Sequence, residues 1–295
     1  MKLTLGPMLY YWPRSQLLAF YEAALEWPVD IVYLGETVCA RRHELRTADW
    51  LALAERFRDA GKTPVLSSQA LLESASDSNL LGRLAASGYL VEANDLGAVK
   101  VARDAGVGFV AGPHLNIYNG PMLDWMAAAG AVCWLPPLEL GHDAIAAVLA
   151  EKTCRIQTEV FAHGRLPLAF SARCFTARHY GLNKDECEFK CMEHPDGLLM
   201  ETQEGKPFLR LNGIQTQSAA CHTLWHHLDE VRELGVDSLR ISPQSQYTPE
   251  IVAAFAARLA GNEAQADWAT WNREGLVDGY WRGTAGIADP QGAEA

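Results

Sequence analysis

The sequence predicts an α/β fold, specifically a TIM-barrel-like parallel β/α barrel with an inserted cysteine-bearing loop region. Two observations lead to this class. First, short runs of β-branched and aliphatic residues alternate with segments of helical periodicity, at a spacing of about 20–25 residues that is typical of parallel βαβ units. Second, the alternation repeats many times, and Gly6-Pro7-Met8 after the first strand lacks the glycine pattern of a dinucleotide-binding turn. Together they favour a barrel over an open sheet.

Strands are expected from the N-terminus onward. The opening segment 1–7 is taken as the first strand and not as a signal peptide, because it has one basic residue, no long apolar stretch and no small-residue cleavage site. The later strands are apolar runs bounded by glycine or polar residues. They are expected at 31–34, 64–67, 89–92, 108–111, 131–135, 156–161, 166–171, 208–211 and 238–241.

Helices are expected where apolar residues recur every three or four positions. Gly61 is the stop signal of a helix over 49–60, and Asn94 or Asp95 is the expected cap of another. Further helices are expected at 80–86, 123–129 and 219–234. The apolar positions that support the first and the last helix are Trp50, Leu53, Ala54 and Phe57, and Leu224, Leu228 and Val231.

We expect a single domain over residues 1–286, since no low-complexity linker interrupts it. Residues 179–206 are polar and poor in periodicity, so they are expected to leave the core, with a hairpin across 195–197. A cluster-binding segment is expected at about 171–206. The last residues, 287–295, are rich in Ala, Gly, Asp and Glu and are expected to be a disordered tail.

The composition excludes several classes of function. The formal net charge is -11, which argues against a nucleic-acid binder and against binding to anionic membrane surfaces. No apolar run approaches the roughly 20 residues that span a bilayer. We therefore expect a cytoplasmic protein, in which the seven cysteines are better interpreted as metal ligands or catalytic groups than as disulfides.

Three cysteines lie close together in the expected cluster-binding segment. Cys187 and Cys191 can reach one inorganic core from a single turn of chain, and Cys174, at the end of a strand, supplies a rigid third ligand. The spacing leaves the fourth ligand open. It also leaves an iron–sulfur cluster and a zinc site equally weighted, although the absence of a Cys-x-x-Cys pair is unlike a zinc ribbon.

The remaining cysteines differ in their expected surroundings. Cys133 lies within a strand and is expected to be a small core residue, and Cys221 is expected early in a helix. Cys39 follows a strand on a loop, and such loops form the functional face of a parallel barrel. Arg41 and Arg42 beside it are able to offset the negative charge of a thiolate-bound cluster.

Candidate catalytic residues are Glu36, Glu159 and Arg173. The two carboxylates lie at strand ends, where a barrel places bases and substrate ligands, although each is equally open to a structural role. Asp95, at a helix start, is better interpreted as a cap. Arg173 adjoins Cys174 and is suited to tuning a cluster or to binding an anionic substrate.

Six segments resemble the UbiV type of the collagenase-like peptidase family (U32), and the resemblance runs over about residues 1–286. They are Tyr33–Glu36, Glu92–Gly97, Ser171–Arg178, Asp185–Cys187, Leu211–Thr216 and Gly279–Arg282. The resemblance implies a TIM-barrel-like domain and a 4Fe-4S cluster bound by Cys39, Cys174, Cys187 and Cys191. It also implies a heterodimer with a UbiU-like sister subunit. The pair is implied to hydroxylate a ubiquinone precursor without oxygen, with prephenate as the hydroxyl donor.

The peptidase signature of that family is only partly present. Residues 159–164 fit its beginning, but Arg165 and Pro167 stand where a small residue and a cysteine are expected, and Ala172 replaces a glycine. The resemblance implies that Cys39 replaces the missing cysteine as a ligand. We therefore expect a hydroxylase subunit and not an active peptidase. The alternatives are a collagenase-like peptidase with Glu159 as its acid–base group, and a scaffold whose cluster is only structural.

Overall fold

The computed structural model describes residues 1–289, and its central feature is a closed barrel of eight parallel strands. Neighbouring strands pair in the order β11-β1-β2-β3-β4-β5-β6-β7, and β7 pairs in turn with β11, which closes the ring. The predicted fold class is thereby confirmed. The barrel strands are β1 (Lys2–Leu5), β2 (Ile31–Leu34), β3 (Thr63–Ser67), β4 (Leu90–Ala93), β5 (Phe109–Ala111), β6 (Ala131–Trp134), β7 (Gln157–Phe170) and β11 (Ser238–Ile241).

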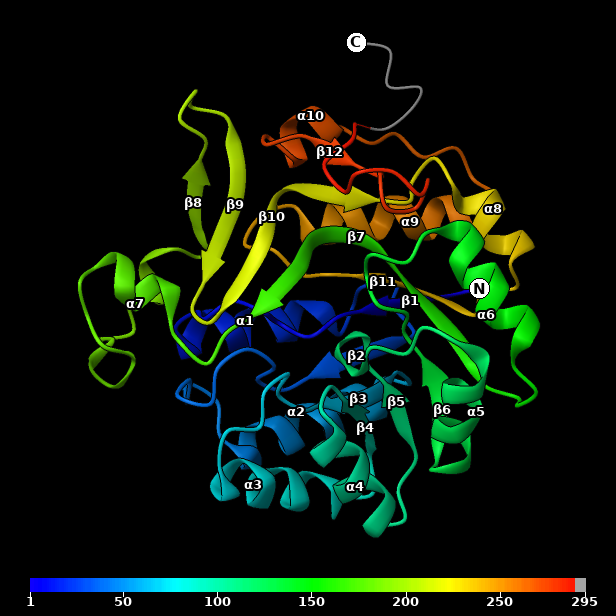
Figure 1. The fold of residues 1–295 in the computed structure, drawn as a ribbon, viewed down its shortest axis with the longest axis horizontal. Helices are drawn as coiled ribbons and strands as arrows, with labels where there is room; N and C mark the ends of the chain where they lie inside the picture. The colour runs from blue at the N-terminus through cyan, green and yellow to red at the C-terminus, as the bar shows by residue number, and fades with distance from the viewer. Residues whose placement is uncertain (290–295) are drawn as a thin grey trace.

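Helices surround the barrel and bury their apolar faces against the outward side chains of the strands. Figure 1 shows α2, α3 and α4 on one side of the barrel and α8 and α9 on the opposite side. The predicted face of α2, which includes Trp50 and Phe57, is buried. The helices are α1 (Arg14–Ala24), α2 (Thr47–Asp59), α3 (Ala75–Ala85), α4 (Leu96–Asp104), α5 (Gly120–Ala128), α6 (His142–Glu151), α8 (Leu228–Glu233) and α9 (Thr248–Leu259), followed by the short α10 (Trp268–Trp271).

The long strand β7 belongs to two layers. Its first half pairs with β6 and β11, and its second half pairs antiparallel with β10 (Gln215–Thr223), which continues to β9 (Pro207–Asn212) and β8 (Leu198–Glu201). Gly164, at φ +134, lies where the strand passes Ser242, and a Cβ there would lie 2.6 Å from that side chain. A glycine is needed at this point because an L side chain would clash.

Two sequence predictions are corrected in this region. The strands expected at 156–161 and 166–171 are one continuous strand, β7. The helix expected over 219–234 is wrong, because residues 215–223 form β10 and only Leu228–Glu233 are helical. Cys221 therefore lies on a strand, where the short β12 (Leu276–Val277) pairs with it. Apolar spacing alone did not reveal the pairing of β10 with β7, which joins residues far apart in the chain.

The segment that carries three of the predicted ligands leaves the barrel after β7. It contains α7 (Phe175–His179) and 3-10 turns at Lys184–Glu186 and Lys190–Glu193, and it projects from the same side as the C-terminal end of β7 (Figure 1). Two hydrogen bonds hold the end of this segment where the chain returns toward the barrel. Trp12 Nε1 donates to Pro195 O at 2.7 Å, and Ser245 N donates to Asp196 Oδ1 at 2.8 Å. The hairpin expected at 195–197 instead turns at 202–206, between β8 and β9.

The remaining short element, a 3-10 turn at Pro113–Leu115, follows β5. Of the tail expected at 287–295, residues 290–295 lie outside the described part of the chain. Within residues 1–289, no helix combines the length and the apolar character that crossing a bilayer requires.

Candidate functional site

The four cysteines named as cluster ligands line one cavity, of about 340 Å³ when the part open to solvent is counted. Cys39 comes from the loop after β2, and Cys174 directly precedes α7. Cys187 directly follows the first of the two 3-10 turns, and Cys191 lies in the second. The loop after β2 lies at the C-terminal end of the barrel strands, which is the face that carries function in this architecture. Residues separated by about 150 positions in the sequence are thereby brought to one space.

Glu36 shapes the loop that carries Cys39. Its Oε1 accepts backbone N–H groups from Val38 at 3.0 Å and from Cys39 at 3.1 Å, and it lies 3.6 Å from Arg42 Nη1. Burial raises the pKa of Glu36, and Arg42 acts in the opposite direction. The candidate base thus has its contacts within its own loop, so its evident role is to position Cys39.

Arg42 is a buried cation beside the cavity and is only 4% exposed. Its Nη1 donates to Leu9 O and its Nη2 to Asn212 Oδ1, each at 2.7 Å, which ties the loop to β9. Burial raises the pKa of Cys39 and of Cys191, and Arg42 counteracts this rise in both. Arg42 therefore favours the thiolate, which is the form that ligates metal.

The loop and the inserted segment are also joined directly. The Arg41 guanidinium donates to Asp185 Oδ1 at 3.1 Å and to the backbone O of Asp185 at 2.8 Å. Lys184, another residue at the cavity, pairs with Glu73 at 2.6 Å. On the other side of the cavity, Cys174 Sγ accepts the backbone N–H of Ala177 at 3.4 Å. These contacts hold the cysteine-bearing elements against one another.

The residues at this cavity fit an iron–sulfur cluster in type and number. A cubane takes one protein sulfur at each of its four irons, so its ligands surround a core. Four cysteines line this one cavity, with the cations Arg42 and Lys184 also lining it, which matches the number and the type of ligand that a cubane needs. Among residues 1–289, no three His, Cys, Asp or Glu side chains are grouped as ligands of one metal ion.

Gly213, in the two-residue turn between β9 and β10, should be essential to this arrangement. Its φ is +66, and an added Cβ would lie 3.0 Å from Arg42 Nη2. We expect Gly213→Ala to lower the free energy of unfolding by more than the roughly 1–2 kcal/mol that a left-handed alanine costs, and to reduce the iron content. Gly205→Ala is the matched control, since Gly205 has φ +76 and no atom within 4 Å of an added Cβ. Equal urea denaturation and iron content in the two variants would contradict this role.

Glu159 lies inside the barrel, where it is fully buried. Its Oε1 accepts from Thr4 Oγ1 at 2.5 Å and from Arg240 Nε at 2.9 Å, and its Oε2 accepts from Tyr33 OH and from Arg240 Nη2. Arg240 also donates to Glu92 at 2.5 Å. Both carboxylate oxygens of Glu159 are therefore occupied by internal partners.

The charges in this interior network depend on one another. Burial alone would lower the pKa of Arg240, but Glu159 and Glu92 outweigh it and raise the pKa well above the usual value. Burial, and then the charge of Glu159, raise the pKa of Tyr33 well above its usual value. Arg240 thus stays charged and Tyr33 stays a hydrogen-bond donor. Arg240 was not among the sequence candidates, although an arginine within the short apolar run 238–241 was the signal for it.

The other sequence candidates lie apart from the cysteine cavity. Arg173 is exposed, and its backbone N–H donates to Ser171 Oγ at 3.1 Å, so it does not line the cavity. Asp95 is confirmed as a helix cap, because its Oδ1 accepts the N–H of Gly97 at 2.6 Å. Of the three catalytic candidates, only Glu36 contacts the cysteine-bearing loop, and Glu159 belongs to the barrel interior.

A second cavity, of about 360 Å³ when the part open to solvent is counted, lies at the mouth of the barrel and is lined by Arg240 and Glu92. His114 lines it and packs edge-on against Phe170, with ring centroids 4.7 Å apart. Burial, and then Arg240, lower the pKa of His114 to about 4, so its imidazole is neutral. Thr37 also lines this cavity, and because it lies two residues before Cys39, one loop borders both spaces.

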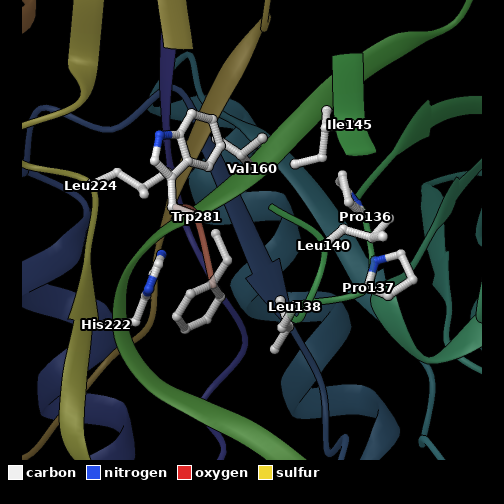
Figure 2. A pocket seen from close by; sticks show the side chains of 10 residues that line it. Pro136, Pro137, Leu138, Leu140, Ile145, Val160, His222, Leu224 and Trp281 are labelled. Carbon is white, nitrogen blue, oxygen red and sulfur yellow. The ribbon is translucent and has the colours of Figure 1, made fainter. Parts of the chain in front are cut away.

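A third cavity, of about 310 Å³ when the part open to solvent is counted, is lined by apolar side chains and by His222. Figure 2 shows the indole of Trp281 and the rings of Pro136 and Pro137 around it, with His222 of β10 at its edge. Burial lowers the pKa of His222 to about 4 and that of the nearby His163 to about 3. These imidazoles are neutral and buried, so the cavity offers no charged group to a ligand.

The buried histidines predict an acid-sensitive fold. Unfolded histidine has a pKa near 6.5, so below about pH 6.5 the unfolded chain binds protons that the folded chain does not. The stabilisation is complete above that pH and falls as the pH drops toward the lowered folded pKa. We expect the free energy of unfolding of the wild-type protein, measured by urea denaturation, to fall by about 2 kcal/mol more between pH 7 and pH 5 than that of His222→Gln. The same pH dependence in both proteins would rule out this contribution of His222.

The fold and the cavity define a TIM-barrel-like α/β protein with four cysteines converging at the C-terminal face of the barrel. The chain belongs to peptidase family U32, whose sequence model matches residues 17–267.

Individual relatives are distant. A protein named collagenase from Porphyromonas gingivalis is 24% identical over 299 residues, covering 88% of this chain and 70% of its own length. The structure of a U32 peptidase aligns with 83% of this chain and 94% of its own, at 12% identity and a TM-score of 0.45. Thiamine phosphate pyrophosphorylase from Pyrococcus furiosus aligns with 88% of this chain and 96% of its own, at 11% identity and a TM-score of 0.44.

Proposed function

We propose that this chain is the 4Fe-4S cluster-binding subunit of a heterodimer that hydroxylates a ubiquinone precursor without oxygen. The observation that carries the proposal is that Cys39, Cys174, Cys187 and Cys191 line a single cavity. The identity of the substrate, of the UbiU-like partner and of prephenate as hydroxyl donor comes from the sequence resemblance.

A cluster bound at these cysteines would supply one-electron redox chemistry to the site. The protein's own residues have separate roles. Arg42 compensates the charge of the thiolates, and Glu36 holds the backbone of the Cys39 loop. The barrel-mouth cavity, with the neutral His114 and the cation Arg240, is suited to binding a polar small molecule, since it lies at the face where barrel enzymes bind their substrates.

A peptidase is the second candidate, because a 24% identical relative carries the name collagenase. Glu159, the acid–base group in that candidate, is fully buried and bound to Arg240, Thr4 and Tyr33. A general base must come within hydrogen-bond reach of its substrate, directly or through one water. The described structure therefore favours the cluster-binding function over peptide hydrolysis at Glu159.

The test is to co-express the chain with its sister subunit and purify both anaerobically. We expect a 1:1 complex in size-exclusion chromatography and single-turnover hydroxylation of the precursor ring. The separate chain should be inactive, and deletion of its gene should lower ubiquinone only in anaerobic growth. Hydroxylation by the single chain, or unchanged anaerobic ubiquinone after deletion, would refute the proposal. Hydrolysis of a collagen-like peptide would instead favour the peptidase.

The same complex separates a working cluster from a structural one. If the cluster serves the reaction, a complex whose cluster has been removed or lost should remain assembled and stop hydroxylating. If a cluster-free complex still hydroxylates the precursor, the result would instead support the alternative that the chain is a scaffold whose cluster is only structural.

A further inference from the structure

The cysteine cavity has one bulky apolar side chain in its wall, that of Phe189. The other described residues that line it are the four cysteines, the cations Arg41, Arg42, Lys184 and Lys190, and the small residues Thr176, Ala177 and Gly213. The apolar shell around a metal site controls how far solvent reaches the metal. In this wall, the ring of Phe189 is the group suited to excluding water.

The backbone that carries Phe189 has a strained conformation. Phe189 has φ +53 and the preceding Glu188 has φ +49, and both lie between Cys187 and Cys191. A left-handed conformation is costly for any residue that has a side chain, and most of all for a bulky one. Strain of this kind persists only where surrounding contacts hold it, and it is common at functional sites.

The contact that holds the turn is made by the ring itself. Phe189 packs against Tyr11, with ring centroids 5.5 Å apart and an angle of 49° between the ring planes. Aromatic pairs at this separation attract one another. Tyr11 is only 4% exposed, and its hydroxyl accepts the backbone N–H of His43 at 3.2 Å. The strained turn is thereby joined to the loop that carries Cys39.

We propose that Phe189 shields the cluster from water and dissolved solutes, and that the left-handed turn at Glu188 and Phe189 holds its ring in place. The side chain lines the cavity and is also 37% exposed, so it lies at the boundary between the cysteines and solvent. The inference rests on the proposed cluster-binding function, to which it adds the residue that controls access to the site.

Two glycine variants of the full chain separate the ring from the strain. Glycine adopts the left-handed conformation readily, so Phe189→Gly and Glu188→Gly both relieve strain in this turn, but only Phe189→Gly removes the ring. Glu188 does not line the cavity, and its ion pair with Lys190, at 3.6 Å, is exposed. Phe189→Tyr keeps an aromatic ring and is the conservative variant.

The first measurement is the rate of iron loss to added EDTA under anaerobic conditions. We expect Phe189→Gly to lose iron about tenfold faster than wild type, since residues beside the ligands of a metal site affect its affinity by at least that factor. Glu188→Gly and Phe189→Tyr should lose iron at the wild-type rate. Equal rates of loss in Phe189→Gly and Glu188→Gly would overturn the proposal.

The second measurement needs no cluster. In the metal-free full chain, alkylation by iodoacetamide, followed by mass spectrometry, reports how readily a solute reaches each cysteine. Cys191 should react faster in Phe189→Gly than in Glu188→Gly, whereas Cys154, which does not line the cavity, should react equally in both. If the anaerobically purified chain holds neither iron nor sulfide, the proposed function fails, and the alkylation rates alone decide whether Phe189 shields the cysteines. Equal rates at Cys191 would then overturn the shielding role.

Discussion

Replacing Cys39 by alanine is expected to lower the iron content of anaerobically purified protein from about four atoms per chain to less than one. Cys39 lines the cavity with the other three cysteines, and its loop is fixed by Glu36 and Arg42. A cubane with one thiolate removed exposes an iron to solvent, and no other cysteine lines this cavity. Iron and sulfide analysis of the full chain measures the effect directly.

Three cysteines serve as controls, because none of them lines the cavity. Cys133 packs inside the barrel with Tyr33 and Val65, and Cys221 Sγ accepts from Gln244 Nε2 at 3.2 Å. Cys133→Ala, Cys154→Ala and Cys221→Ala should therefore retain their iron. Cys133 and Cys39 are about equally buried, at 7% and 8% exposure, so a general loss of stability would affect both variants. Undiminished iron in Cys39→Ala would refute its assignment as a ligand.

Replacing Arg240 by methionine is expected to lower the free energy of unfolding by about 3–5 kcal/mol. Arg240 is 4% exposed and pairs with two buried carboxylates, Glu159 at 2.9 Å and Glu92 at 2.5 Å. Removing the cation leaves two buried acids without their charged partner, which costs far more than losing the contact itself. Urea denaturation measures this loss.

A double variant isolates the cause. Adding Glu159→Gln to Arg240→Met removes one of the stranded charges, so the double variant should be more stable than Arg240→Met alone. If Arg240→Met does not fold, recovery of folded protein in the double variant gives the same answer. Arg232→Met is the control, since Arg232 forms an exposed pair with Asp229 and should change stability by less than about 1 kcal/mol. A loss in Arg240→Met no larger than in this control would contradict the network.

The barrel was predictable because its strands are short, buried and separated by amphipathic helices. The stretch 31–34 and the helical face of 49–60 reflect local patterns that survive in the fold. The sheet beyond the barrel was less predictable. Residues 219–223 share apolar spacing with 224–231, but their conformation is set by pairing with β7, a contact between residues far apart in the chain. The long-range pairing overrode the local pattern.

The cysteines named from the sequence line one cavity in the structure, whereas the contacts that position them were not predicted. The spacing of Cys174, Cys187 and Cys191 indicated a cluster segment, whereas the fourth ligand came only from resemblance. Spacing could not supply it because Cys39 reaches the segment through tertiary contacts, such as Arg41 with Asp185 and Arg42 with Asn212. Their expected positions at strand ends suggested Glu36 and Glu159 as catalytic bases. In the structure, loop amides donate to Glu36 and Arg240 donates to Glu159, and sequence spacing does not predict these contacts.

The central claim is that the four-cysteine cavity holds a 4Fe-4S cluster, and elemental analysis of the anaerobically purified full chain tests it most directly. Iron, acid-labile sulfide and zinc are measured on one sample, together with the visible absorption that sulfur-to-iron charge transfer gives. We expect about four irons and four sulfides per chain, and a brown protein. Stoichiometric zinc without sulfide, in a colourless protein, would contradict the account.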